Sequence, residues 1–291
     1  MQTIDRLDPL RDAVSALRKD GPVALVPTMG ALHDGHLTLV REAKARAGSV
    51  VVSIFVNPRQ FGAGEDLDAY PRRLERDCAM LEAEGVALVW APPVEVMYPA
   101  GYATNIAVSG LGDGLCGAAR PGHFDGVATV VCKLFHQVLP DVALFGEKDW
   151  QQLAVIRRMA RDLDLTRPFA RDIIGVRTVR EPDVLAMSSR NAYLTHAERA
   201  RAAALPRAMQ QAVAAIEGGE QAAPALSRLA ATLAESGFAS VDYAELREAE
   251  TLAPLERAGP VEGRLLVAAR IGRARLIDNM AVRSTPSSSR A

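Results

Sequence analysis

The sequence is poor in cysteine and in long apolar runs. Its three cysteines, Cys78, Cys116 and Cys132, are odd in number and never form a Cys-x-x-Cys pair, so neither a disulfide framework nor a zinc ribbon is indicated. No apolar run approaches the roughly 20 residues that span a bilayer. The first residues, MQTIDRLDPLRDAV, include acidic side chains and no apolar core, unlike a signal peptide. We therefore expect a soluble cytoplasmic protein.

The sequence also lacks an excess of charge of either sign. It has 34 basic and 35 acidic residues and a formal net charge of -1, which provides no broad cationic field for a nucleic-acid backbone or an anionic membrane. We expect neither nucleic acid nor membrane as a partner. Any phosphate binding must come from a local arrangement of residues.

The length and the hydropathy pattern predict two domains. A chain of 291 residues with 49% hydrophobic residues can bury a large core and exceeds one typical domain. Short apolar runs that predict strands lie at residues 23–27, 49–56, 87–90, 141–145 and 173–179. Helical spacing lies at residues 35–47, 71–84 and 126–138, with a further helix beginning near residue 149. This alternation predicts an α/β fold, a doubly wound, Rossmann-like parallel sheet, over residues 1–178.

The remaining residues predict a smaller α+β domain, a lid, over residues 179–283. Alanine-rich helical segments at residues 195–217 and 222–235 precede strand-like segments at 241–246, 264–269 and 274–277. Pro206, Gly218 and Pro224 interrupt the heptads that a coiled coil needs. The polar residues 284–291 are expected to be a disordered tail.

The segment VPTMGALHDGHLTLV places two histidines where a strand gives way to a helix. His33 and His36 lie three residues apart, flanked by Gly30 and Gly35. Ligands of open α/β sheets bind beyond the carboxyl ends of strands, and the first amides of a helix suit phosphate oxygens. The histidines could also be capping or surface residues, or metal ligands, although no third ligand is visible nearby.

Two further segments follow in the predicted sheet domain. In SIFVNPRQF a strand runs into a turn at Asn57 and Pro58, and Gln60 could bind a small polar substrate or be solvated. In RPGHFDGV, residues 120–127, the glycines shape a turn, while His123 and Asp125 could orient active-site groups or cap a helix. The structural interpretation of this last segment is preferred, and we leave it outside the catalytic set.

Phosphate-binding chemistry recurs in two later segments. ALFGEKDWQQL, residues 143–153, ends a strand with Gly146 and supplies Lys148 and Asp149, which suit a phosphate and a ribose or helix cap. LAMSSRN supplies Ser188, Ser189 and Arg190, a donor set for polyphosphate oxygens or an ordinary capping turn.

These motifs together resemble a known family. His-x-Gly-His after a first strand is similar to the signature of the adenylyl-transferring superfamily, and PTMGALHDGH with the four later segments resembles the pantothenate synthetase family. The resemblance implies ATP-dependent joining of pantoate to β-alanine through a pantoyl-adenylate, with Mg²⁺, in a homodimer formed by the larger domain. His36 is implied as the proton donor, and Gln60 and Gln152 as pantoate ligands, Gln60 also lying by β-alanine.

The resemblance implies further roles. His33, His36, Lys148 and Arg190 are expected to be catalytic. The nucleotide is expected to contact Met29, Gly30, Ala31, Leu32, His33, Asp34, Gly35, His36, Gly146, Glu147, Lys148, Asp149, Val179, Met187, Ser188, Ser189 and Arg190.

One residue departs from the family pattern. Val184 stands where the family usually has glycine before the Ser-Ser-Arg loop, and a β-branched residue tolerates positive φ poorly. Two other functions remain open: a nucleotidyltransferase that stops after adenylyl transfer, and a nucleotide-sensing module on the same fold.

Overall fold

The computed structural model describes residues 1–62 and 64–283 and divides into two compact units. The first comprises Met1–Glu147 and Gln151–Arg177, and the second comprises Lys148–Trp150 together with the chain from Thr178 onward. The predicted boundary at residues 178 and 179 stays a prediction, and the placing of Lys148–Trp150 with the second unit was not anticipated. The predicted tail lies outside the described residues.

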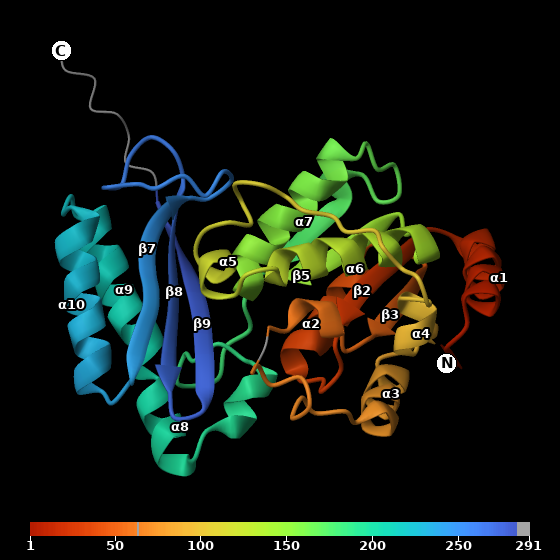
Figure 1. The fold of residues 1–291 in the computed structure, drawn as a ribbon, viewed down its shortest axis with the longest axis horizontal. Coiled ribbons are helices and arrows are strands. Elements are labelled where there is room, and N and C mark those ends of the chain that lie inside the picture. The colour runs from red at the N-terminus through yellow and green to blue at the C-terminus, as the bar shows by residue number, and fades with distance from the viewer. Residues whose placement is uncertain (63, 284–291) are drawn as a thin grey trace. The chain divides into compact units, whose positions relative to one another are not determined.

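A six-stranded parallel sheet forms the centre of the first unit (Figure 1). Its order is β1-β4-β3-β2-β5-β6, and all of its strand pairs are parallel. The strands are β1 (Gln2–Ile4), β2 (Val23–Thr28), β3 (Ser49–Ile54), β4 (Leu88–Trp90), β5 (Val142–Gly146) and β6 (Ile173–Val176). The strand order reverses direction along the sheet between β2 and β5. The predicted doubly wound fold is therefore confirmed.

Helices connect these strands. They are α1 (Leu7–Leu17), α2 (Asp34–Lys44), α3 (Leu74–Ala83), α4 (Val94–Met97), α5 (Cys116–Ala119), α6 (His123–Val138) and α7 (Trp150–Asp162). Short 3₁₀ turns are η1 (Arg18–Asp20), η2 (Pro58–Gln60), η3 (Glu147–Asp149) and η4 (Ala170–Asp172). Strand β1, of three residues, and helix α1 were not predicted.

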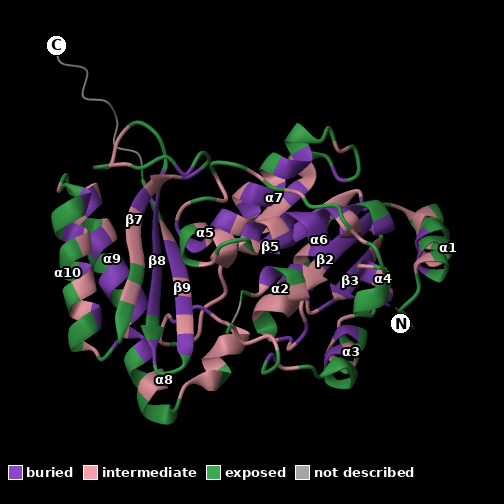
Figure 2. Cartoon of the chain, viewed as in Figure 1, coloured by how far each residue is buried: buried purple, intermediate pink, exposed green. Residues whose placement is uncertain are grey.

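The central strands are buried on both faces, which explains their continuous apolar runs (Figure 2). Alternate residues of β2, Ala24 and Val26, pack with apolar residues of α2 and α3. On the opposite face α6 contributes Phe135, whose ring contacts Phe145 edge-on. Each fully buried aliphatic or aromatic side chain stabilises the fold by about 1.5–3 kcal/mol. The strand ends are thereby held in a fixed register beneath the loops that follow them.

The second unit is an antiparallel three-stranded sheet with helices packed on it. The strands, in the order β7-β8-β9, are β7 (Ser240–Glu248), β8 (Gly263–Ile271) and β9 (Ala274–Val282). The helices are α8 (His196–Ala202), α9 (Ala204–Glu217) and α10 (Ala222–Glu235), preceded by the 3₁₀ turn η5 (Ser189–Tyr193). Met209 and Leu229 of the helices share one apolar cluster with Leu265 and Val267 of β8.

Lys148–Trp150 is attached to this second unit by hydrogen bonds and a cation–π contact. The indole N–H of Trp150 donates to the carbonyl of Ala249 at 2.8 Å, and the Arg264 guanidinium lies 3.5 Å from the centre of the ring. The Asn279 amide donates to the carbonyl of Lys148 at 2.9 Å. The chain therefore leaves the first unit at residue 148 and returns to it at residue 151.

The prediction of one helix over residues 195–217 is wrong. Helix α8 ends at Ala202 and α9 begins at Ala204. Pro206 is the third residue of α9, where its missing N–H needs no partner, but its ring clashes with the carbonyl of residue 202 in a continuous helix. Pro224 is likewise the third residue of α10. Both prolines therefore lie in the first turn of a helix, and Pro206 separates α9 from α8.

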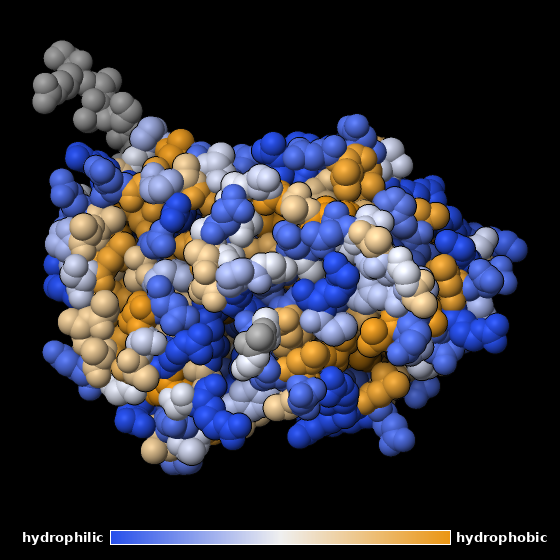
Figure 3. All heavy atoms as spheres, viewed as in Figure 1, coloured by the Kyte–Doolittle hydropathy of each residue, from blue (hydrophilic) through white to orange (hydrophobic). Residues whose placement is uncertain are grey.

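Strand ends differ from the prediction by a few residues. The strand predicted at 274–277 continues to Val282, and the strand predicted at 173–179 ends at Val176. On the face drawn in Figure 3, hydrophilic residues are interspersed with hydrophobic ones. Within residues 1–62 and 64–283, none of the helices has the length and apolarity needed to cross a membrane.

Candidate active site

The loop after β2 lies at the carboxyl edge of the parallel sheet. Thr28 ends the strand, and its hydroxyl donates to the carbonyl of Ser53 on β3 at 2.8 Å and accepts from the N–H of Gly30 at 3.2 Å. Gly30 and Ala31 both have left-handed φ angles, +82° and +51°. Helix α2 begins at Asp34, one residue before the predicted start, with His33 as its N-cap. The turn is therefore fixed between two neighbouring strands and one helix.

Asp77 holds this loop from α3, a role that the sequence did not reveal. Its two carboxylate oxygens accept from the backbone N–H groups of Ala31 and Leu32 at 2.8 and 2.9 Å, and the residue is 1% exposed. A Cβ on Gly30 would lie 3.0 Å from one of these oxygens, so this position needs glycine for space as well as for its φ. Ala31 and Leu32 use their N–H groups inside the protein, and any nucleotide contact they make comes from other atoms.

The two histidines lie against each other at the start of α2. Their ring centroids are 4.1 Å apart, and the Nδ1 atom of His36 accepts from the backbone N–H of His33 at 3.3 Å. A ring nitrogen that accepts carries no proton, so the proton of neutral His36 is on Nε2. This is the tautomer that can donate a hydrogen bond to a phosphate oxygen.

Gln60 connects the second predicted segment to the first. It ends the turn η2, is 9% exposed, and its amide nitrogen lies 3.0 Å from the sulfur of Met29. Its amide oxygen accepts from the side chain of Asn57 at 3.1 Å. The structure thus brings Gln60 beside the histidine loop at the carboxyl ends of β2 and β3.

Asn57 fixes the orientation of the Gln60 side chain. Its amide nitrogen also donates to the carbonyl of Gly126 at 3.0 Å, and its oxygen accepts from the Tyr98 hydroxyl at 2.9 Å and from the N–H of Arg59 at 3.3 Å. Because both ends of the amide are bonded, it has one stable orientation. Burial raises the pKa of Tyr98, so this hydroxyl keeps its proton and remains a donor.

The segment RPGHFDGV belongs to the same region. Arg120 and His123 both contact the backbone carbonyl of Gln60, a long-range contact that no sequence pattern indicated. Gly126 of this segment allows α6 to lie close to the turn η2, because a Cβ at this position would be 2.2 Å from the carbonyl oxygen of Arg59.

Two adjacent glutamines at the start of α7 have different environments. Gln151 is buried, accepts from the N–H of Cys116 at 3.1 Å, and donates to the carbonyls of Leu111 and Gly114, each at 2.8 Å. Gln152, the predicted pantoate ligand, is half-buried. Gln151 is structural, which leaves Gln152 as the candidate ligand. At the end of β5 the space around the Gly146 Cα is open.

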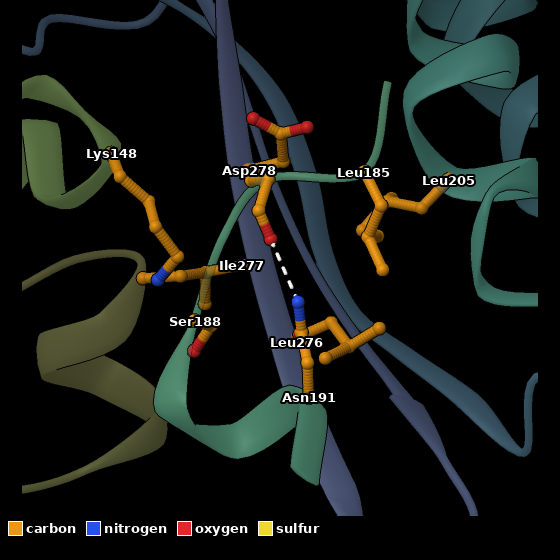
Figure 4. Close-up of a pocket in the computed structure, with 9 residues that line it drawn as sticks. Lys148, Leu185, Ser188, Asn191, Leu205, Leu276, Ile277 and Asp278 are labelled. Carbon is orange, nitrogen blue, oxygen red and sulfur yellow. Dashed lines mark hydrogen bonds between the residues drawn. The ribbon is translucent and has the colours of Figure 1, made fainter. Parts of the chain in front are cut away.

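A small pocket in the second unit brings Lys148 and Ser188 together (Figure 4). It is lined by Lys148, Leu185, Ala186, Ser188, Asn191, Leu205, Leu276, Ile277 and Asp278. In Figure 4 the Lys148 side chain extends to the side where Ser188 lies. Two predicted phosphate ligands, 40 residues apart in the sequence, therefore line one pocket.

The predicted Ser-Ser-Arg loop has a defined backbone. The Ser188 hydroxyl accepts from the N–H of Arg190 at 3.3 Å and so caps η5. The N–H of Met187 donates to the carbonyl of Val179 at 3.0 Å, joining two predicted nucleotide contacts. The Asn191 amide donates to the carbonyl of Ala186 at 3.1 Å. The capping alternative thus describes the Ser188 side chain in this conformation.

Val184 adopts the left-handed conformation that its position suggested, with φ +70°. The N–H of Val184 donates to the carbonyl of Glu181 at 2.9 Å, and the N–H of Glu181 donates to the carbonyl of Leu185 at 2.8 Å. This is the pattern of a three-residue hairpin loop whose last residue is usually glycine. The backbone is strained here because valine is β-branched.

Two arginines hold this hairpin. Arg199 forms two hydrogen bonds to the carboxylate of Asp183, at 2.5 and 3.1 Å, and Arg180 donates to the carbonyl of Val184 at 3.0 Å. Arg180 also pairs with the buried Asp278 through two bonds of 2.7 and 2.9 Å. Hydrogen bonds from Arg199 lower the pKa of Asp183.

The predicted residues form two groups. The first unit holds Met29, Gly30, Ala31, Leu32, His33, Asp34, Gly35, His36, Gln60, Gly146, Glu147 and Gln152, and the second holds Lys148, Asp149, Val179, Met187, Ser188, Ser189 and Arg190. Among the described residues, no group of three or more His, Cys, Asp or Glu side chains is arranged to hold a metal ion.

Comparison with known proteins gives one result along nearly the whole chain. The family model for pantoate-beta-alanine ligase matches residues 2–281. The chain is 68% identical to the pantothenate synthetase of Novosphingobium aromaticivorans, over 97% of this chain and 99% of that protein.

Solved structures give the same result. A pantothenate synthetase from Thermus thermophilus has a TM-score of 0.88 and 48% identity, covering 97% of this chain and 99% of that one. The Francisella tularensis pantoate-beta-alanine ligase, complexed with beta-gamma ATP and beta-alanine, has a TM-score of 0.82 and 31% identity, covering 99% and 100%. The histidine loop precedes α2, Gln60 lies in the turn after β3, and the Ser-Ser-Arg loop leads into η5. Together with these similarities, this shows that the chain belongs to the pantoate-beta-alanine ligase family.

Proposed function

We propose that this chain joins D-pantoate to β-alanine at the expense of ATP, giving pantothenate, AMP and pyrophosphate. The observation that carries the proposal is the contact between Gln60 and Met29. It places a neutral hydrogen-bonding amide beside the histidine loop, at the edge of a parallel sheet where ligands bind. A carboxylate held by Gln60 would lie beside phosphates held at the start of α2.

Two in-line steps account for the products. A carboxylate oxygen of pantoate bonds to the α-phosphorus of ATP while the bond from that phosphorus to the bridging oxygen breaks, and pyrophosphate leaves. The β-alanine amine then bonds to the acyl carbon, the bond from that carbon to the adenylate oxygen breaks, AMP leaves, and the nitrogen loses a proton to solvent. Neither step needs an enzyme nucleophile, so catalysis is positioning and charge stabilisation.

The side chains divide these tasks. We assign phosphate binding to His33 and His36, and the Nε2–H of His36 would donate a hydrogen bond to a phosphate oxygen on which charge develops. Lys148, Ser188, Ser189 and Arg190 are assigned to the polyphosphate, and Gln60 and Gln152 to pantoate. Asp77 holds the histidine loop, and its charge is compensated by two backbone N–H groups.

The remaining predicted nucleotide contacts frame the base and ribose in this proposal. Mg²⁺, when bound, would supply positive charge to the phosphates. Since the described residues offer no cluster of three ligands, the nucleotide's own oxygens and water are the expected ligands. We also propose a homodimer formed by the larger domain, on the family resemblance.

The proposal is tested by measuring pyrophosphate and AMP from the purified protein with ATP, Mg²⁺ and D-pantoate, with and without β-alanine. Pyrophosphate should require pantoate, and AMP and pantothenate should accumulate only with β-alanine. His36→Ala should abolish turnover, and His36→Gln, which returns an N–H near the Nε2 position, should recover part of it. ATP binding without pantoate-dependent pyrophosphate would contradict the proposal and favour a sensor or another acceptor.

A further inference from the structure

Two side chains converge on one backbone carbonyl, that of Gln60, and a third holds one of them in place. The Nδ1 atom of His123 lies 2.8 Å from this oxygen, and Nη2 of Arg120 donates to it at 3.1 Å. Glu65 accepts two hydrogen bonds from the same guanidinium, at 2.7 and 2.5 Å. We call Glu65, Arg120 and His123 the carbonyl clamp.

The clamp fixes the protonation of His123. A carbonyl oxygen only accepts, so Nδ1 carries a proton; a guanidinium only donates, so Nε2, 3.0 Å from Nη1 of Arg120, carries none. This arrangement requires a proton on Nδ1 and leaves Nε2 facing the arginine. A proton on Nε2 would point at the arginine and break the arrangement.

Charge supports the same geometry. The side chains of Arg120 and Glu65 are only 14% and 24% exposed, and a shielded bidentate pair of this kind is directional as well as attractive. Burial raises the pKa of Glu65, but the hydrogen bonds and the charge of Arg120 outweigh it, so the pKa of Glu65 lies below its ordinary value. Glu65 stays ionised and holds the guanidinium in place.

The rest of Gln60 is also held. Asn57 holds its amide oxygen, and α6 lies so close at Gly126 that a Cβ there would be 2.8 Å from the backbone nitrogen of Gln60. The backbone and the side chain of one residue are therefore restrained from separate elements. Such support is what a ligand-binding group needs to keep its geometry.

We propose that Glu65, Arg120 and His123 are positioning residues for pantoate, acting through Gln60 without touching the reacting atoms. This inference rests on the proposed function and gives the RPGHF segment, outside the predicted catalytic set, a defined task. Releasing the carbonyl lets the turn η2 shift and displaces the Gln60 amide. A displacement near 1 Å costs roughly 10²-fold in rate.

The test uses two isosteres of His123. His123→Asn places an amide N–H near the former Nδ1 and keeps the bond to the carbonyl, whereas His123→Gln places its amide near Nε2 and loses that bond. We expect His123→Gln to lower kcat/KM for pantoate about 10- to 100-fold, with a raised KM for pantoate and little change in the KM for ATP. His123→Asn should stay near wild type. Arg120→Lys, which cannot span both the carboxylate and the carbonyl, should resemble His123→Gln.

The same helix offers a matched control. His136 of α6 places its Nδ1 2.9 Å from a backbone carbonyl, that of Cys132, and lies more than two turns along the helix from His123. His136→Gln should leave both KM values unchanged, and thermal unfolding of each variant checks its fold.

The outcomes separate the two proposals. Equal KM values for pantoate in His123→Asn and His123→Gln, or equal rises in the KM for pantoate and ATP, would overturn the clamp while leaving the ligase intact. A wild-type protein that makes no pantothenate would instead overturn the proposed function.

Discussion

Replacing Val184 by glycine should stabilise the second unit. A β-branched residue in the left-handed region carries about 2–3 kcal/mol of strain, which glycine removes. Losing the half-buried valine side chain costs about 1 kcal/mol, and the greater freedom of glycine in the unfolded chain costs about 0.5–1 kcal/mol. These terms sum to a rise of about 0–1.5 kcal/mol in the free energy of unfolding, or of up to about 6 °C in the Tm.

The assay can be confined to the second unit. The chain has two tryptophans, Trp90 in β4 and Trp150 in the second unit. In a Trp90→Phe background, urea unfolding followed by fluorescence reports Trp150 alone. Each Val184 variant is made in that background, so the cost of Trp90→Phe cancels in the comparison.

Three substitutions separate strain from packing. Asparagine tolerates left-handed φ better than alanine, so strain predicts that Val184→Gly and Val184→Asn exceed Val184→Ala by about 1 kcal/mol. Val241→Gly removes another half-buried valine from an extended strand and should only destabilise. If Val184→Ala were as stable as Val184→Gly, or if all three variants were less stable than wild type, the strain argument would be refuted.

Three other changes have defined outcomes. Asp77→Asn keeps one acceptor but turns an amide N–H toward the backbone N–H of Ala31 or Leu32. We expect kcat to fall about 10-fold or more. Full activity in steady-state assays would mean that the histidine loop does not need this carboxylate. Asp183→Asn should lower the free energy of unfolding at pH 7 by less than about 1 kcal/mol, given the partial exposure of its pair with Arg199. Because the folded pKa of Asp183 is depressed, that loss is fully present above its ordinary pKa of 3.8 and diminishes as the pH falls through the lowered folded pKa. Urea titrations should therefore give a smaller difference at pH 3 than at pH 7, and a pH-independent difference would contradict this. Ser53→Ala removes a fully buried hydroxyl whose oxygen has no hydrogen-bond partner within the described part of the chain. The free energy of unfolding should therefore stay unchanged or rise by up to about 1 kcal/mol. A fall of more than about 1 kcal/mol on thermal unfolding would show that the hydroxyl has a partner.

The fold was predictable where the chain's own periodicity carries the information. Strands β2 and β3 are almost continuously apolar because both faces are covered, and this pattern needs no knowledge of the partners. Strand β1 has three residues, two of them exposed, and so leaves no such pattern. Only its pairing with β4 makes it a strand.

The motifs that carry the candidate site could be located in the sequence, but the contacts around them could not. His36, Gln60 and Lys148 follow strands in recognisable segments. Asp77, in contrast, is an acidic residue in an ordinary helical pattern, and its role depends on a loop 45 residues earlier. His123 was singled out in the sequence, yet the carbonyl it holds carries no side-chain signature. Backbone acceptors are the same at every residue, so sequence cannot indicate which one a side chain will bind.

The attachment of Lys148–Trp150 to the second unit has a consequence for synthesis on the ribosome. The partners of this segment, Ala249 and Asn279, follow it by 99 and 131 residues. At a translation rate of about 5–20 residues per second, Asn279 is synthesised roughly 7 to 26 seconds after Lys148, whose carbonyl accepts from its amide. Until then Lys148–Trp150 lacks these partners, although Gln151 can already bond to Leu111, Gly114 and Cys116. A ribosomal pause between residues 150 and 249 would therefore prolong the time for which the Trp150 indole lacks its carbonyl partner.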